Sequence, residues 1–145
     1  MYRVQAEKFD VSQLTASLYD DVKNVGGVAS FVGFVRADGE VRALELSHYP
    51  GMTEQSLKCI ADEAYSRWSL ANVIIVHRIG TLATSEQIVF VGASSEHRKD
   101  ALDACAFMAD QLKTRAMLWK KEHLSNGTRW VEQKEEDALV AAKWR

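Results

Sequence analysis

Apolar residues recur along this chain with two different periods, which separate helical segments from strands. A spacing of three to four residues predicts two long amphipathic helices, over 53–68 and over 96–112. Their apolar stripes include Tyr65 in the first helix and Leu102 in the second. Shorter helices are expected over 12–23 and 137–144. The predicted N-caps are Ser12, Thr53 and either Ser94 or Ser95.

Runs rich in β-branched and aromatic residues predict strands between these helices. They cover residues 2–4, 28–36, 41–49, 73–79, 87–93 and 129–132. Asp38-Gly39 separates the second run from the third and is a typical two-residue hairpin signal, so these two strands are expected to pair antiparallel. The mixture predicts an α+β fold, with a mixed, mainly antiparallel sheet against which helices pack.

Length and charge limit the classes of function. A chain of 145 residues without repeats or a linker fits one domain over residues 1–145. The formal net charge is −2, so no overall field favours nucleic acid or an anionic membrane, and any anion site must be a local cluster. No apolar run approaches the roughly 20 residues of a membrane span, and the N-terminus lacks the apolar core of a signal peptide. We expect a cytoplasmic protein.

The sequence gives little indication of a reactive thiol, a metal site or a nucleotide-binding loop. Cys59 and Cys105 fall on the apolar stripes of the two long helices, so they are expected to be small buried side chains. The four histidines and two cysteines show no paired short spacing, so no metal site is predicted. Neither a Walker-type glycine loop nor a GxGxxG motif is present.

The most informative segment is LKTRAMLWKKE, residues 112–122. On a continuous helix Lys113 and Lys120 lie two turns apart on one face, about 10 Å from each other. One interpretation is a solvated basic face of an amphipathic helix, which is common. The other is an anion site in which a partly desolvated lysine has a lowered pKa.

Further basic residues are candidates for the same chemistry. Arg36 ends an apolar strand and is either an ordinary strand-end arginine or one that projects over the edge of the sheet. His97 and Arg98 lie in the first turn of a predicted helix, where the helix dipole disfavours cations, and such local conflicts often mark function. His77 and Arg78 fit an exposed edge pair equally well.

Six segments occur along the chain in the order SHYPGM (47–52), VIIVHRIG (73–80), QIVFVGA (87–93), EHR (96–98), LKTRAMLWKKE (112–122) and RWVE (129–132). Together they closely resemble the MoaE family, the large catalytic subunit of molybdopterin synthase. The resemblance covers residues 26–145, whereas the residues before it are generic.

The resemblance implies an α/β-hammerhead-like fold and a sulfur transferase of molybdenum cofactor synthesis. The family converts cyclic pyranopterin monophosphate to molybdopterin. Sulfur comes from the C-terminal Gly-Gly thiocarboxylate of a small ubiquitin-like subunit. The large subunit forms a central homodimer within a heterotetramer, and the step needs no metal or redox cofactor. Inert cysteines fit this chemistry, because the partner supplies the sulfur.

Carried over by position, the resemblance implies a set of site residues. Lys113 and Lys120 are the expected catalytic residues, suited to orienting the acyl group, stabilising the developing charge and transferring protons. The substrate-binding set is Phe34, Val35, Arg36, His97, Arg98, Lys113, Lys120, Lys121 and Glu122. Within it, Arg36, His97 and Arg98 suit the cyclic phosphate.

Two positions depart from the family pattern. Phe34 stands where the family commonly has lysine, which removes one cation from the substrate side, and Met117 stands where proline is frequent. Phe34 is the best evidence for one alternative, a scaffold that binds the small subunit without turnover. A second alternative, which rests on the basic cluster and on no resemblance, is another enzyme of phosphorylated metabolites.

Helix length leads to one more hypothesis. A single helix over 96–112 places His97 about 24 Å from Lys113 along its axis. We therefore expect His97 and Arg98 to come from a neighbouring subunit.

Overall fold

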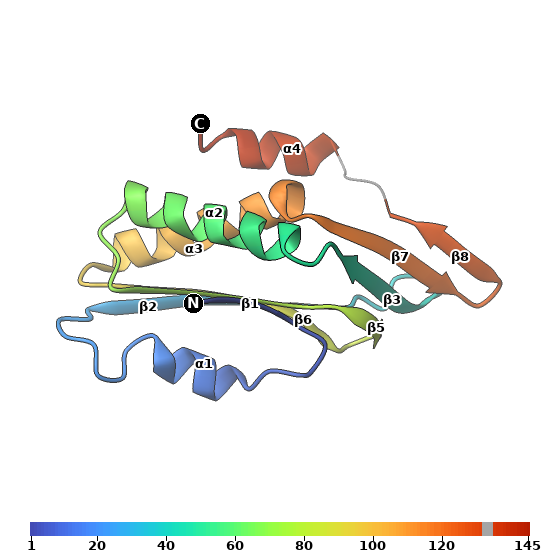
Figure 1. Cartoon of the computed structure of the whole chain (residues 1–145), viewed down its shortest axis with the longest axis horizontal. Coiled ribbons are helices and arrows are strands. Elements are labelled where there is room, and N and C mark those ends of the chain that lie inside the picture. Colours follow the sequence, from blue (N-terminus) through green and yellow to red (C-terminus); the bar gives the residue numbers. More distant parts are fainter. Residues whose placement is uncertain (132–134) are drawn as a thin grey trace.

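Two four-stranded sheets and four helices make up the computed structural model, which describes residues 1–131 and 135–145 (Figure 1). The strand orders are β1-β4-β6-β2 and β5-β3-β7-β8. The strands are β1 (Tyr2–Gln5), β2 (Gly27–Phe34), β3 (Val41–His48), β4 (Asn72–Arg78), β5 (Gly80–Ala83), β6 (Gln87–Ser95), β7 (Leu118–Leu124) and β8 (Gly127–Trp130). The helices are α1 (Val11–Ser17), α2 (Met52–Arg67), α3 (Arg98–Arg115) and α4 (Glu135–Ala142).

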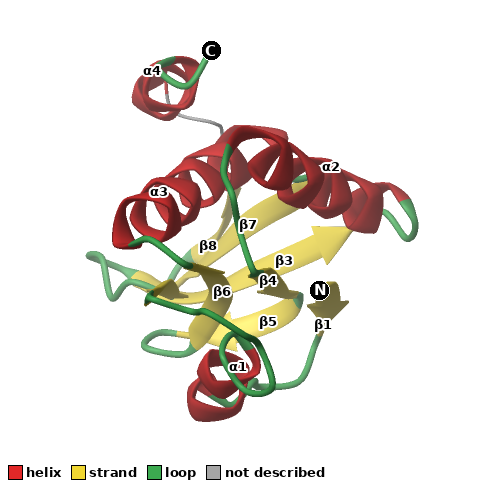
Figure 2. Ribbon diagram, turned by 90° about the vertical axis from the view of Figure 1, so that its left-hand side faces the viewer, coloured by secondary structure: helices red, strands yellow, loops and turns green. Residues whose placement is uncertain are grey.

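Helices cover both faces of the first sheet, as Figures 1 and 2 show. α2 and α3 lie on one face, where Leu57, Ile60 and Phe107 are almost wholly buried. α1 covers the other face, and its Leu14 packs in a second cluster with Phe90 of β6. Each such side chain contributes about 1.5–3 kcal/mol on burial. The predicted α+β class is confirmed, with mainly antiparallel pairs and one parallel pair, β1 with β4.

The predicted hairpin at Asp38-Gly39 is wrong. The chain does turn there, since Gly39 has φ +61° and the Val41 amide donates to the Asp38 carbonyl. However, β2 pairs with β6, whereas β3 pairs with β5 and β7 in the other sheet. A turn signal is local and does not fix the partner, which depends on where each strand buries its apolar face.

A continuous helix through residues 112–122 is also wrong. α3 ends at Arg115, Ala116 adopts extended dihedrals, and the chain continues as β7. Lys113 therefore lies in the last turn of α3, whereas Lys120 lies in a strand. Pairing with a distant strand accompanies this change, because β7 forms an antiparallel ladder with β3 from His48↔Leu118 to Val41↔Leu124.

Several caps and boundaries differ from expectation. Asp10, not Ser12, caps α1 through the Gln13 amide. Thr53 lies inside α2, whose N-cap is Gly51. Ser94 and Ser95 belong to β6, and His97 is the N-cap residue of α3.

The apolar stripes contain exposed members as well. Cys105 is buried, as predicted, but Cys59 is exposed, as are Tyr65 and Leu102. The sequence pattern does not predict the short strand β5. In the predicted strand 129–132, Glu132 lies outside the described residues.

Candidate active site

The two lysines of the basic segment lie near each other although they belong to different elements. Lys120 is directly opposite Leu46 of β3, so the two side chains share one face of the second sheet. Leu46 is buried and packs against Val35, the residue that follows β2. This contact brings the end of β2 to the face of β7 that carries Lys120.

The surroundings of Lys120 disfavour its charged form. Burial lowers the pKa of the half-buried Lys120 amine, and the positive charge of Lys113 lowers it further. The carboxylate of Asp137 in α4 acts in the opposite direction. A lowered pKa increases the fraction of neutral amine, which can accept a proton or attack an acyl group. The interpretation as a solvated basic face therefore does not fit Lys120.

His77 lies beside these lysines. It is 5% exposed at the end of β4, so the interpretation as an exposed edge residue is wrong. Burial lowers the pKa of its imidazole from 6.5 to about 4, and the charges of Lys120 and Lys113 lower it further. Its Nδ1 is 2.8 Å from the Arg78 carbonyl oxygen, and since a carbonyl only accepts, Nδ1 carries the proton. A neutral imidazole thus adjoins the two amines.

Arg78 is buried for a structural reason. Its Nε and Nη2 donate to the Ala6 carbonyl, and its Nη1 donates to the Gln87 carbonyl. The same Nη1 lies 3.3 Å from a Glu86 carboxylate oxygen. These bonds fix the chain after β1 to the start of β6, so Arg78 is not free to bind a ligand.

Phe34, Val35 and Arg36 lie at the same end of the first sheet as the lysines. In this sheet Gly33 of β2 pairs with Val89 of β6, and Val89 pairs with His77 of β4. Gly33 and His77 are therefore two strand spacings apart, or about 10 Å. Val35 is buried, and its amide donates to the Glu86 carbonyl. Arg36 and Phe34 are exposed, and the Arg36 guanidinium is 3.8 Å from Asp38. Arg36 is therefore available to an anion near the lysines.

Lys121 and Glu122 lie on opposite faces of β7. Lys121 is opposite Glu45, and its amine lies over the Trp130 ring, 4.9 Å from the centroid. Glu122 lies on the same face as Lys120 and accepts a hydrogen bond of 2.7 Å from Arg129. The structure thus turns Lys121 away from Lys120.

His97 and Arg98 lie at the other end of α3. Fifteen residues separate Arg98 from Lys113, or about 22 Å along the helix. A Cβ placed on Gly27 would be 3.1 Å from the Arg98 Cα, so this helix end lies at the start of β2. Arg36 follows the end of the same strand. Within one chain, His97 and Arg98 are therefore distant from Arg36 and from both lysines.

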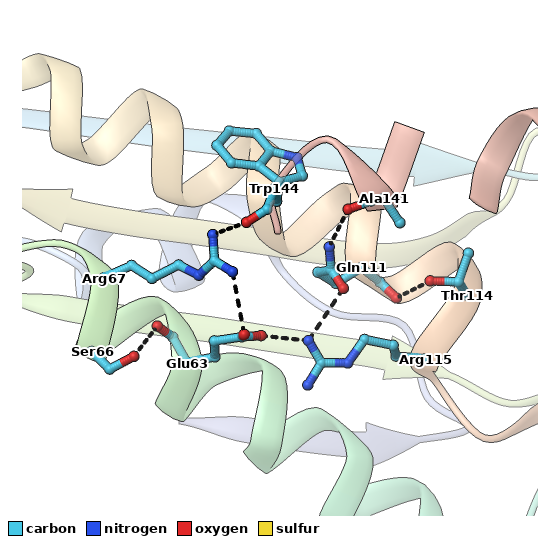
Figure 3. A network of polar contacts seen from close by, with 8 residues as sticks. All are labelled: Glu63, Ser66, Arg67, Gln111, Thr114, Arg115, Ala141 and Trp144. Atoms are coloured by element: carbon cyan, nitrogen blue, oxygen red, sulfur yellow. Dashed lines mark hydrogen bonds and ion pairs between the residues drawn. The ribbon is translucent and has the colours of Figure 1, made fainter. Parts of the chain in front are cut away.

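A polar network fixes the end of α3 that carries Lys113 (Figure 3). Glu63 of α2 accepts bonds from Arg67 and Arg115, and the bond from Arg115 lowers the pKa of Glu63. Arg67 also donates to the Trp144 carbonyl, and Gln111 donates to the Ala141 carbonyl. A cavity of about 370 Å³ lies between these helices. Of this network, the sequence alone could have indicated only the pair of Glu63 and Arg67, which are four residues apart on one helix.

Other polar residues have structural partners. His123 Nε2 is 2.8 Å from a Glu45 carboxylate oxygen, a pair that the sequence did not reveal because it joins β7 to β3. His48 lies 3.8 Å from Glu54. Among the residues that the structure describes, no group of three His, Cys, Asp or Glu side chains is arranged to hold a metal. In the same residues, no helix is long and apolar enough to cross a membrane.

Comparison with known proteins decides the family. The family model described as "MoaE protein" matches residues 4–115, which is well over half of the chain. The chain belongs to the MoaE family. The curated molybdopterin synthase catalytic subunit of Pseudomonas aeruginosa is 50% identical to this MoaE protein over 98% of this chain and 97% of its own length.

Solved structures of MoaE proteins and of a molybdopterin synthase share the fold of this chain. The molybdopterin biosynthesis MoaE protein of Burkholderia ambifaria has a TM-score of 0.86 at 44% identity, covering 99% of this chain and 97% of that one. A structure titled molybdopterin synthase, from Staphylococcus aureus, has a TM-score of 0.81 at 33% identity, covering 89% and 95%. The fold of this MoaE protein is therefore that of solved relatives over nearly its whole length.

Proposed function

We propose that this chain is the catalytic subunit of a molybdopterin synthase. It would convert cyclic pyranopterin monophosphate to molybdopterin, with sulfur from the thiocarboxylate of a small ubiquitin-like subunit. Relatives that bear this name share 40–50% of their residues with it. The observation that carries the proposal is the pair Lys113 and Lys120, with the Lys120 amine half-buried and its pKa lowered.

The lysines suit acyl chemistry at a thiocarboxylate. An ammonium group orients the acyl oxygen and stabilises the negative charge that develops on it. A neutral amine at Lys120 can accept the proton that such a reaction releases. Cys105 is buried, and burial raises its pKa to about 11, so it is a poor nucleophile. These properties support a reaction at the lysines and a partner as the source of the sulfur.

A small subunit is the proposed partner. A solved structure from Helicobacter pylori, titled as a complex of subunits 1 and 2 of molybdopterin-converting factor, shares the fold at a TM-score of 0.77 and 18% identity. We extend this type of partner to the present chain. A cytoplasmic location stays a prediction.

One assay separates this function from its alternatives. Purified chain is combined with thiocarboxylated small subunit and cyclic pyranopterin monophosphate, and dithiolene product is measured. Product formation supports the synthase. A tight complex without product would favour a scaffold, for which the exposed Phe34 in place of a cation is the specific argument. Neither complex nor product would favour a different enzyme of phosphorylated metabolites.

We further propose that the active site is composite. His97 and Arg98 lie far from Lys113 and Lys120 within one chain, so the partner subunit in a homodimer would supply them. Mixing His97→Ala with Lys113→Ala protein leaves one intact site in each mixed dimer. We expect activity to return to about a quarter of the wild-type value, since half of the dimers are mixed and each has one good site.

The matched control uses two variants of the same half-site. Lys113→Ala mixed with Lys120→Ala damages every site of a mixed dimer, so activity should stay absent. Recovery in neither mixture, after exchange of subunits has been verified, would contradict the composite site.

A further inference from the structure

A histidine that has no part in the proposed function so far lies on the same face of the second sheet as Lys120. Leu46 and His48 are two residues apart in β3, so their side chains leave the strand on the same side. Leu46 is opposite Lys120 of β7, and His48 is opposite Leu118; the two strands lie side by side in Figure 1. Diagonal neighbours such as His48 and Lys120 are about 7–8 Å apart, within reach of long and aromatic side chains. His48 is therefore a neighbour of the half-buried amine.

A carboxylate from another element faces this imidazole. Glu54 lies in the first turn of α2, and its Oε2 accepts a hydrogen bond of 2.7 Å from the Gly51 amide, which fixes the side chain. Its Oε1 is 3.8 Å from His48 Nε2, too far for a hydrogen bond. In the described part of the chain, this Oε1 is buried and has no hydrogen-bond partner. Because a buried carboxylate oxygen without a donor is unfavourable, it favours a proton on the nitrogen that faces it.

We propose that His48, oriented by Glu54, carries to solvent the proton that Lys120 takes up during sulfur transfer. With its Nε2 proton facing Glu54, the imidazole has Nδ1 as its free base. An Nζ–H bond of the Lys120 ammonium breaks and an Nδ1–H bond forms, so the positive charge moves from the amine to the imidazole. The imidazolium then loses this proton to water, which the side chain reaches because it is 24% exposed. This inference rests on the proposed function, since it concerns the chemistry of Lys120.

The stoichiometry of the proposed reaction requires such a route. A dithiolene has two sulfur atoms and each thiocarboxylate supplies one, so each product needs two transfers. The Lys120 amine must be neutral to accept a proton in each of them. It therefore has to lose the proton of the first transfer before the second. Since burial separates much of this amine from water, a partly exposed imidazole beside it provides the path.

Other titratable groups near Lys120 suit this task less well. His77 of β4 is buried and its pKa is lowered to about 4, so it takes up a proton poorly. Glu122 of β7 already accepts a hydrogen bond of 2.7 Å. Lys113 of α3 acts on the amine as a positive charge, and Asp137 of α4 is a carboxylate, a much weaker base than an imidazole. The histidine of β3 combines partial exposure with a carboxylate that pairs with its imidazolium form.

The rates of the two transfers test the role of His48. In His48→Ala the first transfer should keep its wild-type rate, because it does not depend on the loss of an earlier proton. The second should slow by about 100-fold, the low end of what a positioned acid or base contributes. Singly sulfurated pyranopterin should then accumulate, which rapid quenching and mass spectrometry detect. Added imidazole should restore the second transfer in proportion to its concentration, whereas a merely structural defect would slow both transfers and not respond.

His123→Ala is the matched control. His123 also pairs with a carboxylate, since its Nε2 is 2.8 Å from a Glu45 oxygen. It is three residues after Lys120 in β7, so it lies on the opposite face of the strand. The substitution therefore removes the same kind of contact from the same sheet but leaves the face of Lys120 unchanged. The two transfers should keep their wild-type ratio, and imidazole should have no effect.

Glu54→Gln keeps the proposal testable if His48→Ala does not fold. The glutamine oxygen can still accept from the Gly51 amide, so the start of α2 is kept while the charge that faces His48 is removed. The second transfer should again slow more than the first. A wild-type second transfer in the folded variants, or equal slowing of both transfers without a response to imidazole, would overturn the proposal.

These results can be told apart from a failure of the proposed function. If the wild type forms molybdopterin and His48→Ala forms it at the wild-type rates, only the role of His48 is wrong. If the wild type transfers no sulfur from a thiocarboxylated small subunit, the synthase activity is wrong before any variant is compared.

Discussion

At the scale of single residues, the burial of His77 determines whether it adds a charge to the candidate site. Its imidazole is buried between the end of β4 and the two lysines, and its pKa is lowered to about 4, first by burial and then by the lysine charges. At neutral pH it is therefore uncharged, and the positive charge near this end of β4 comes from the amines. The sequence places His77 in a strand, but the period-two pattern cannot tell a buried strand end from an exposed one.

The lowered pKa of His77 predicts a pH-dependent stability. Between pH 6.5 and about pH 4 the unfolded chain binds a proton at His77 that the folded chain does not, so stability falls as pH falls through this window. The effect amounts to about 3 kcal/mol at most. His77→Asn keeps a donor for the Arg78 carbonyl but does not titrate, so it should lessen the slope of unfolding free energy against pH.

Urea unfolding of both proteins across this pH window measures the difference. The variant loses packing at every pH, so the slopes are compared and not the absolute values. Equal slopes for wild type and His77→Asn would show that His77 is not the residue responsible.

At the scale of elements, the connection between α3 and β7 sets the distance between the lysines. The wholly buried Thr53 of α2 accepts a hydrogen bond from the Tyr49 amide and donates to the Met117 carbonyl. The Ser56 hydroxyl accepts from the Met117 amide. The first turns of α2 therefore hold the residues where α3 changes into a strand.

Sequence patterns predict some of these elements well and miss the connection between two of them. The 3.6-residue stripes identify α2 and α3 because each helix buries one face against a sheet. The basic segment contains both a helix end and a strand, and the break at Ala116 depends on pairing with β3, far away in sequence. The same long-range choice of partner separates β2 from β3 in spite of the turn at Gly39.

Thr53→Val tests the role of this contact. The substitution keeps the shape of the side chain but leaves the Tyr49 amide and the Met117 carbonyl without their partner, which should cost about 1–3 kcal/mol. Because the connection loosens, we also expect kcat to fall by more than the substrate KM changes.

Ser66→Ala is the matched control, since Ser66 also lies on α2 and its hydroxyl bonds only to the Glu63 carbonyl one turn earlier. It should be close to neutral in chemical unfolding and in sulfur-transfer kinetics. If Thr53→Val resembles Ser66→Ala in both measurements, the contact does not position the site.

At the scale of the whole molecule, the candidate residues divide between two ends of the first sheet. Their positions in the sequence do not show this division, whereas the resemblance to the MoaE family is confirmed. The length of α3 already predicted that His97 is distant from Lys113. The sequence could not predict that Lys121 turns toward Trp130, or that α4 brings Asp137 close to Lys120, because both depend on how distant elements pack.

Trp144 connects this last helix to the rest of the fold. Its ring packs edge-on against Trp68 and Phe107, and its Nε1 donates to Asp110 with a length of 2.7 Å. Trp144→Ala removes these contacts and should destabilise the protein by about 3 kcal/mol. We expect the amides of α4 to exchange hydrogen much faster, while those of β4 and β6 stay protected.

Detachment of α4 has a consequence for the site, because the carboxylate of Asp137 raises the pKa of Lys120. In Trp144→Ala the carboxylate moves away, so the titration of Lys120 should change, and Asp137→Asn, which removes the same charge in a folded protein, should lower the pKa of Lys120 further. NMR titration of ¹³C-methylated lysines measures it. Leu139→Ala, on an exposed position of the same helix, should change neither exchange nor titration. An unchanged Lys120 titration in both Trp144→Ala and Asp137→Asn would contradict a link between the C-terminal helix and the reactive amine.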